Sequence, residues 1–299
     1  MIIVMQQVLL LILFGAVGYT LCKIGKVKNE HTKLLSVLQV YIFLPCTIIN
    51  TFSTNFTVAY ISEKYPLLIS SAIIMVIMIM VGYGLSKLFA KKSYTQYVYR
   101  YSLTVSNYGF FGYPLISGLF GELMLQNAMV FTLPISLYAH SIGYAMLTKT
   151  KFSFKRFLNP AITASIVGAM IGLTGFKIPV VVDNLIDKGA ACMAPIGMLL
   201  AGMVVSEFNF ISLVKVKRNY IVAALRLLVL PCAIAGTLKL LGFEDMMLTA
   251  LMMHAMPCGL NTIVFPCLVG EDCSTGASLT LITSLLACIT VPICVVLFS

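Results

Sequence analysis

Apolar runs of about the length that crosses a lipid bilayer follow one another along almost the whole chain. Charged or turn residues bound each run, and the connections between runs are short. Because 60% of the 299 residues are hydrophobic and only 10% are charged, a water-soluble core of this size cannot bury so much apolar surface. Lipid must therefore be the solvent, and we expect an all-α membrane protein.

Ten transmembrane helices are predicted from these runs. They cover residues 2–22, 33–53, 66–89, 100–120, 123–147, 160–176, 186–206, 219–241, 246–270 and 274–298. No basic segment precedes the first run and no clear cleavage site follows it. We therefore predict that this run is a membrane helix and not a removed signal peptide.

The basic residues predict how these helices are oriented. Most of the 20 Lys and Arg residues lie in connections after odd-numbered helices, whereas only Lys64, Lys177, Lys188 and Lys239 follow even-numbered ones. Because basic residues accumulate in cytoplasmic loops, we expect a multi-pass protein of the cell membrane with both termini outside. The same rule explains the net charge of +10, so we expect no nucleic-acid partner.

Two of the predicted helices, the fourth and the ninth, are interrupted. SNYGFFGYP (106–114) breaks the fourth and PCGLNTIVFP (257–266) breaks the ninth. An unwound segment in lipid leaves backbone groups unpaired, at several kcal/mol each, unless it packs in protein or lines a wet cavity. Paired interruptions at matching places in two halves of a chain are typical of the binding site of a secondary transporter.

The ten helices divide into two sets of five, and features recur between the sets in the same order. Because five is an odd number, the second set enters the membrane from the opposite side. The recurring features are Pro45 and Pro195, Pro134 and Pro292, and the pairs Gly121-Glu122 and Gly270-Glu271. We predict two inverted five-helix repeats, 1–148 and 160–299, joined by a short cytoplasmic linker at 149–159.

Six segments carry a resemblance to a known family. They are FLPCTI (43–48), NYGFFGYPL (107–115), NPAITASIVGAMIG (159–172), MAPIGMLLAGM (193–203), ALRLLVLPC (224–232) and MPCGLN (256–261). In this order and spacing the chain resembles a bacterial member of the auxin efflux carrier family. That family includes the plant PIN transporters and bacterial malate and malonate permeases.

The resemblance implies a fold shared with sodium–bile acid symporters and sodium–proton antiporters. Helices 4 and 9 would cross near the membrane centre. Helices 1, 2, 6 and 7 would form a scaffold that also makes a homodimer, and helices 3–5 and 8–10 a moving transport domain of the elevator type. The family has a Pro-Asn pair at the first crossing, where this chain has Ser106-Asn107. The second crossing keeps Pro257 but continues with Cys258.

The crossing supplies most of the candidate substrate-binding residues. The candidates are Ser106, Asn107, Tyr108, Pro257, Cys258, Gly259, Asn261, Asn50, His254 and Arg226. The residues expected to form the crossing itself are Gly109, Gly112, Pro114, Pro257, Gly259 and Pro266. Each interruption starts a new helix, whose N-terminus carries about +0.5 charge, so two such ends at one point suit a carboxylate.

Three of the polar residues within the predicted helices have two interpretations each. Arg226 either counters a substrate carboxylate or reaches the cytoplasmic face. His254 either contacts the substrate or packs, and Asn50 either lines the path or bonds to a neighbouring helix. His140 is predicted to be structural.

All ten acidic residues fall in loops or at membrane edges on this map, so no carboxylate is expected at mid-membrane. A cation exchanger would need one there, and we therefore predict a carrier of small organic anions such as malate, malonate or an auxin-like acid. Export of a monoanion gains about 2.3 kcal/mol per 100 mV and needs no coupling ion.

Other functional classes stay open or are disfavoured. The alternatives are a sodium- or proton-coupled symporter and a non-transporting receptor, and sodium is not excluded. We expect no enzyme, cofactor or metal site, because the peripheral acids and scattered His residues form no catalytic or metal-binding pattern. The substrate, the direction of transport and the coupling do not follow from the sequence.

Overall fold

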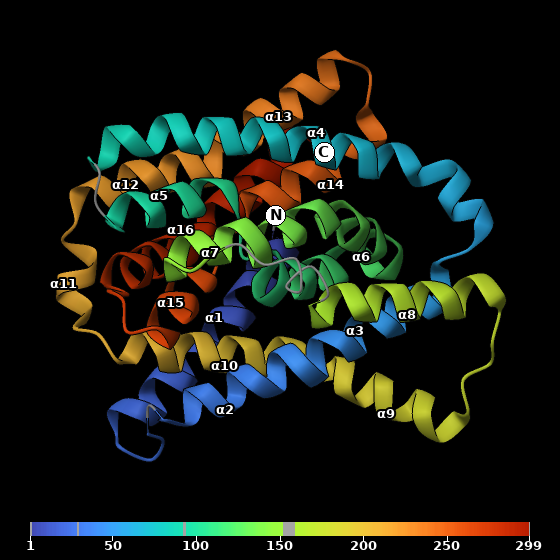
Figure 1. Cartoon of the computed structure of the whole chain (residues 1–299), viewed down its shortest axis with the longest axis horizontal. Helices are drawn as coiled ribbons and strands as arrows, with labels where there is room; N and C mark the ends of the chain where they lie inside the picture. Colours follow the sequence, from blue (N-terminus) through green and yellow to red (C-terminus); the bar gives the residue numbers. More distant parts are fainter. Residues whose placement is uncertain (1, 29, 92–93, 152–158, 299) are drawn as a thin grey trace.

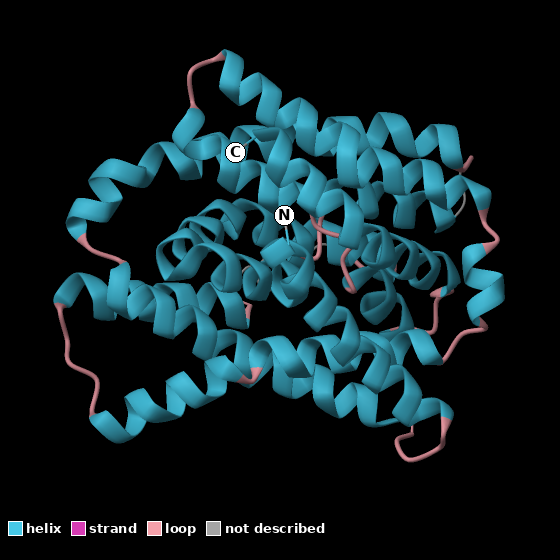
Figure 2. Cartoon of the chain, turned by 180° about the vertical axis from the view of Figure 1, so that it is seen from behind, coloured by secondary structure: helices cyan, strands magenta, loops and turns pink. Residues whose placement is uncertain are grey.

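The computed structural model describes residues 2–28, 30–91, 94–151 and 159–298, and it consists of helices joined by short loops (Figures 1 and 2). The first half forms α1 (Ile2–Lys23), α2 (Glu30–Leu38), α3 (Leu44–Asn55), α4 (Val58–Phe89), α5 (Tyr94–Thr104), α6 (Tyr113–Tyr138) and α7 (Tyr144–Thr148). No strand occurs in the described ranges, so the predicted all-α class is confirmed. Most of the predicted linker, 152–158, lies outside the described residues.

The described residues of the second half form nine further α-helices. They are α8 (Pro160–Thr174), α9 (Val180–Ala191), α10 (Met193–Ser206), α11 (Phe210–Val214), α12 (Lys217–Ala224), α13 (Leu230–Leu240), α14 (Glu244–Ala255), α15 (Asn261–Leu268) and α16 (Ser274–Phe298). Four π-helical segments are also described: η1 (Gln39–Phe43), η2 (Tyr108–Gly112), η3 (Ala139–Gly143) and η5 (Leu225–Val229). Short π-helical segments within α-helices are frequent at functional sites.

Among the described residues, six helical segments are long and apolar enough to cross a membrane, by length and composition. They are Leu34–Asn55, Val58–Phe89, Tyr108–Thr148, Val180–Ser206, Lys217–Leu240 and Ser274–Phe298. Fewer segments than the predicted ten meet these criteria. Leu9–Lys23 and Pro160–Thr174, in the first and sixth predicted helices, are apolar but too short. Tyr108–Thr148 contains two predicted helices that meet at Gly121, where φ is 78° and ψ is −174°. The interruptions also leave α5, α14 and α15 with only 11, 12 and 8 residues.

Two pairs of helices approach so closely that only glycine fits between them. Where α1 packs along α10, a side chain at Gly202 would overlap the backbone of Gly15, and one at Gly18 would overlap Leu199. Where α3 packs along α8, a side chain at Gly172 would lie 2.6 Å from the carbonyl oxygens of Phe52 in α3 and of Phe56, which follows α3. Small residues at the contact are a common way for membrane helices to pack.

A second set of contacts surrounds the helices that lead into the two interruptions. α4 packs on α5, and α13 packs on α14. These inner helices are deeply buried, since Tyr101 and Leu103 of α5 and Met252 and Ala255 of α14 are all 0% exposed. The interruptions that follow them therefore lie inside protein and not against lipid.

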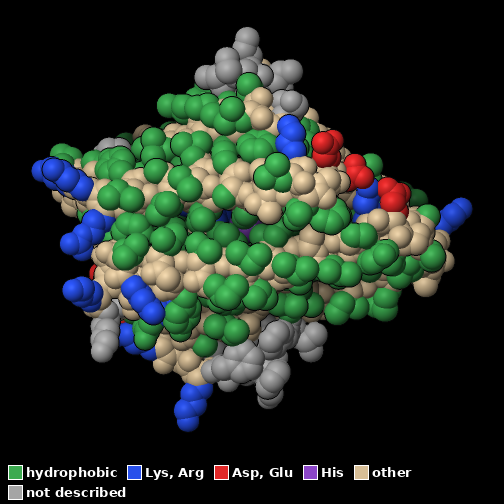
Figure 3. Space-filling view, turned by 90° about the horizontal axis from the view of Figure 1, so that it is seen from above, with side chains coloured by type: hydrophobic (Ala, Val, Ile, Leu, Met, Phe, Trp, Pro, Cys, Tyr) green, Lys and Arg blue, Asp and Glu red, His purple; other side chains and the backbone are tan. Residues whose placement is uncertain are grey.

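The outer surface is largely apolar, as a lipid environment requires. On α4, for example, Ile69, Ile73, Val76 and Met80 are more than half exposed. In the view of Figure 3, most of the visible Lys and Arg side chains lie at one end of the molecule, and hydrophobic side chains cover the surface beyond them. This distribution is that of a membrane protein with a basic end.

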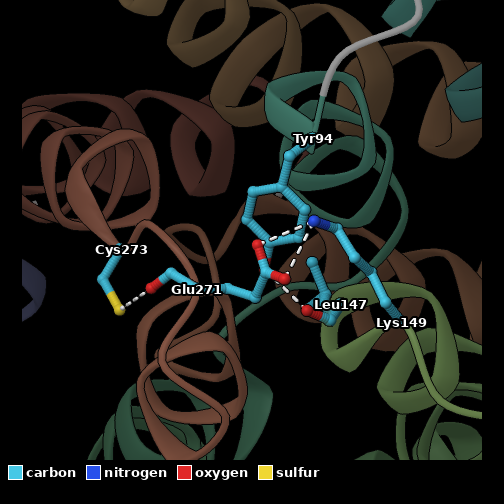
Figure 4. A network of polar contacts seen from close by, with 5 residues as sticks. All are labelled: Tyr94, Leu147, Lys149, Glu271 and Cys273. Carbon is cyan, nitrogen blue, oxygen red and sulfur yellow. Dashed lines mark hydrogen bonds and ion pairs between the residues drawn. The ribbon is translucent and has the colours of Figure 1, made fainter.

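A polar network joins three connections of the chain (Figure 4). Lys149 Nζ lies 2.8 and 2.9 Å from the two carboxylate oxygens of Glu271 and 5.0 Å from the centre of the Tyr94 ring. The Tyr94 hydroxyl donates to the Leu147 carbonyl at 2.6 Å, and burial raises the pKa of Tyr94, which keeps the hydroxyl protonated. The network links the start of α5, the end of α7 and the connection between α15 and α16.

The α1–α10 contact makes a prediction about stability. Gly202→Ala should destabilise the purified protein by about 1–3 kcal/mol, because the added methyl overlaps the Gly15 carbonyl. The control is Gly236→Ala in α13, where an added methyl meets nothing within 4 Å. Thermal unfolding in detergent compares the two variants, and equal midpoints would contradict the close contact.

Candidate functional site

The two interruptions cross and bond to each other through their backbones. Ser106 and Cys258 form an isolated antiparallel β-bridge. The backbone N–H of Asn107 donates to the carbonyl of Pro257 at 2.8 Å. Each unwound segment thus satisfies part of the hydrogen bonding that the other lost when its helix ended.

The side chains at this crossing also satisfy exposed carbonyls, and they do so reciprocally. The Ser106 hydroxyl donates to the carbonyl of Met253, in the last turn of α14, at 2.6 Å. The Cys258 thiol faces the carbonyl of Ser102, in the last turn of α5, at 3.9 Å. The backbone N–H of Cys258 donates to the Thr283 hydroxyl of α16 at 3.0 Å. Each interruption thereby caps the helix that leads into the other.

Small residues allow the two segments to approach. A side-chain carbon at Gly259 would lie 3.4 Å from the Ser106 carbonyl oxygen, and one at Gly112 would lie 3.2 Å from Met256. Pro114 occupies the first turn of α6, where a missing N–H costs nothing. Gly109, in contrast, has nothing within 4 Å of an added side-chain carbon.

The second interruption is shorter than predicted. It covers residues 256–260, and Pro266 lies inside α15 instead of at the crossing. A proline at this position leaves the Thr262 carbonyl without its helical donor. Gly276 of α16 packs directly against that carbonyl, and a side chain at Gly276 would overlap it. The surrounding protein therefore accommodates a proline that the sequence suggested would end the helix.

A cavity of about 120 Å³ opens on one side of the crossing. Six of the predicted residues line it: Ser106, Asn107, Tyr108, Gly109, Gly259 and Asn261. Pockets for drug-sized ligands typically measure about 300–1,000 Å³, so this one suits a small solute.

Three helix N-termini meet at this cavity, each with an asparagine. Asn107 precedes η2 and accepts from the N–H of Phe110 at 3.3 Å, and Asn261 begins α15. Asn159 precedes α8 and accepts from the N–H of Ile162 at 3.0 Å. At about +0.5 charge for each N-terminus, the three supply more than one positive charge without a cationic side chain.

Asn159 is a site residue that the sequence analysis did not identify. Asn159 is 9% exposed, and its side-chain amide nitrogen has no hydrogen-bond partner among the described residues. The Asn-Pro pair at 159–160 predicts only a helix start, because Asn is a common N-cap and Pro a common first residue. Its position beside the crossing depends on how α8 packs, which local sequence does not reveal.

His140 also lines the cavity, although the sequence analysis predicted only a structural role. It lies in η3, where its Nδ1 is 3.0 Å from the Ser136 carbonyl. Its ring meets the ring of Phe265, from α15, at 6.0 Å between centres. His140 is therefore held between two helices at the wall of the cavity.

The remaining candidates lie elsewhere. Asn50 and Pro114 line a separate cavity of about 360 Å³, together with Glu122 and Asp187. His254 is 1% exposed, neither of its ring nitrogens has a hydrogen-bond partner among the described residues, and its ring meets that of Phe131 edge-on. Neither His254 nor the fully buried Arg226 is among the residues that line the cavity at the crossing.

The lining of the cavity determines what it can hold. None of the described residues that line it is Asp, Glu, Lys or Arg. Nor do any three described His, Cys, Asp or Glu residues gather as a metal site requires. Amide groups and helix N-termini provide directed positive potential, and apolar residues such as Leu260 and Phe265 provide the rest. This combination favours a small anion with an apolar part.

The reciprocal capping predicts a stability effect at the crossing. Ser106→Ala should cost about 1–3 kcal/mol, because the Met253 carbonyl is left buried without a partner. Ser62→Ala, which removes an exposed serine bonded within α4, should change stability by less than about 0.5 kcal/mol. Chemical or thermal unfolding in detergent measures both, and a silent Ser106→Ala would contradict the capping role.

Comparison with known proteins shows the family of this chain. The pattern of the membrane transport protein family matches residues 3–150 and 144–295, nearly the whole chain. An uncharacterized transporter of Methanocaldococcus jannaschii is 26% identical over 298 residues, covering 94% of each chain. The predicted family is thus confirmed: the chain belongs to the membrane transport proteins of the auxin efflux carrier type.

Proposed function

We propose that this protein is a secondary transporter that carries small organic anions. The observation that carries the proposal is the meeting of three asparagine-bearing helix N-termini at one small cavity, whose described lining residues carry no charged side chain. Carboxylates bind well at helix N-termini, where N–H groups and the helix dipole point at the ligand. Discontinuous helices whose N-termini face an anionic substrate are a recurring design of secondary transporters.

The absence of charge in the lining suits transport as well as binding. A fixed ion pair with Lys or Arg would hold a carboxylate tightly, whereas dipoles and amide donors hold it more weakly. An apolar wall beside them favours an organic anion over a fully hydrated inorganic one. The cavity volume of about 120 Å³ limits the substrate to a small molecule.

We also propose that the described helices form the ten-helix inverted repeat. In such a repeat, the pair formed by transmembrane helices 1 and 7 (α1 and α10) corresponds to the pair formed by helices 6 and 2 (α8 and α3). The glycine-tight pairs α1–α10 and α3–α8 fit this relation, as do the pairs α4–α5 and α13–α14. Gly121 and Gly270 both have positive φ and end the two interrupted helices, which also supports it.

We further propose an elevator mechanism, in which one set of helices moves against a fixed scaffold. The scaffold is α1–α3 with α8–α10, and the moving domain is α4–α7 with α12–α16. In this mechanism Asn107 and Asn261 travel with the substrate, while Asn159 stays with the scaffold. The network of Lys149, Glu271 and Tyr94 joins both halves of the moving domain. A homodimer through the scaffold and external termini in the cell membrane complete the proposal.

The site assignment predicts the effect of single amides on transport. A thermal-shift screen of organic acids identifies a substrate, and flux is then measured in proteoliposomes. Asn107→Ala should abolish flux, and Asn159→Ala should lower it about tenfold or more, since each loses donors to a charged ligand. The matched control is Asn209→Ala, which removes an exposed N-cap of α11. Normal flux in Asn107→Ala protein that is correctly folded would contradict the site.

Voltage should drive export of a monoanion. An inside-negative potential of 100 mV contributes about 2.3 kcal/mol, enough for a gradient of roughly fiftyfold. A potassium diffusion potential across the proteoliposome membrane tests this without sodium. Equal flux with and without the potential would contradict voltage-driven uniport, and a requirement for sodium or a proton gradient would favour the symporter alternative.

A further inference from the structure

Arg226 is the largest side chain in the described structure that is completely buried, and it has no acidic partner there. It lies in η5 and is 0% exposed. The ion pairs of the described residues involve Lys64, Lys149 and Lys188 instead. A buried charge without a partner is costly, so something else must stabilise the guanidinium.

A helix end provides this stabilisation. One terminal nitrogen of Arg226 donates to the carbonyl of Leu103 at 3.2 Å. Leu103 lies in the last turn of α5, whose final carbonyls have no helical donors after the first interruption. The C-terminus of a helix carries about −0.5 charge, so it attracts a cation.

The second interruption contributes a similar end. η5 packs against both α5 and α14, and α14 ends at Ala255, directly before the second interruption. Two helix C-termini together carry about −1 charge, which one guanidinium neutralises. Nε and the second terminal nitrogen of Arg226 have no hydrogen-bond partner among the described residues, so no other described group neutralises the guanidinium charge.

In secondary transporters, unwound carbonyls and the C-terminal ends of half-helices are where a coupling sodium ion or proton binds. We propose that Arg226 is a built-in cation that takes the place of such a coupling ion at the carbonyl ends of α5 and α14. The inference rests on the proposed anion carrier. Because this cation is covalently attached, the crossing is complete without sodium, and the positive helix N-termini remain available to the substrate.

Monovalent cations test the proposal without any substrate. Thermal unfolding of purified wild-type protein is measured in sodium, potassium and N-methyl-D-glucamine chloride at equal ionic strength, and the midpoints should agree. Arg226→Ala should lower the midpoint by about 5–10 °C in N-methyl-D-glucamine. Sodium, or a few millimolar guanidinium, should then restore part of the loss. Arg226→Lys should keep the wild-type independence of cations.

The control is Arg100→Ala. Arg100 is also buried in α5, but it stacks on the Tyr83 ring, with its guanidinium carbon 3.3 Å from the ring centre, and it lies before the helix end. Its loss should lower the midpoint without creating any dependence on cations. A merely structural Arg226 would behave in the same way as Arg100.

Three results would overturn the proposal. One is saturable stabilisation of the wild type by sodium, and another is an Arg226→Ala protein that no cation stabilises. The third is a thermal midpoint of Arg226→Lys that depends on the cation present. If Arg226→Ala does not fold, the Arg226→Lys and wild-type measurements still test the proposal. Absence of anion flux by the wild type would refute the proposed function alone, since the unfolding series uses no substrate.

Discussion

The backbone of the two interrupted helices is the constraint on which this structure depends. In lipid, an unwound segment must find partners for its N–H and C=O groups within the protein. Here the two segments find them largely in each other, through the Asn107 N–H and Pro257 carbonyl and through the bridge between Ser106 and Cys258. Neither interruption would be tolerated without the other, so the crossing forms as one unit.

The crossing separates charge as well as satisfying hydrogen bonds. The helix N-termini that begin at η2 and α15 lie at the cavity, and η5 packs on α5 and α14, the helices that end at the two interruptions. Amide donors, including that of Asn159, occupy the first side, and Arg226 occupies the second. In the proposed mechanism, the same local break creates a place for an anion and a place for a cation, and only the first is left open to a solute.

Much of this site was predictable because the local sequence of its residues indicates where the helices are interrupted. Glycine and proline inside apolar runs indicate unwound segments, and matching places in two halves indicate that they meet. The exact ends of the breaks were not predictable, because Pro266 continues a helix when Gly276 of a neighbouring helix packs on the freed carbonyl. Asn159 and His140 reach the cavity through packing of α8 and η3, and nothing in their local sequence reveals that contact. For Arg226 the sequence offered two roles, and the structure shows a third partner, the end of α5.

The central claim is that the cavity at the crossing recognises the negative charge of a small organic acid. Titration calorimetry at neutral pH with the acid identified by screening, and with its uncharged primary amide of nearly the same shape, tests this claim most directly. We expect the carboxylate to bind at least about tenfold more tightly than the amide, a difference of about 1.4 kcal/mol. Equal affinity for both, or tighter binding of the amide, would contradict an anion site built from helix N-termini.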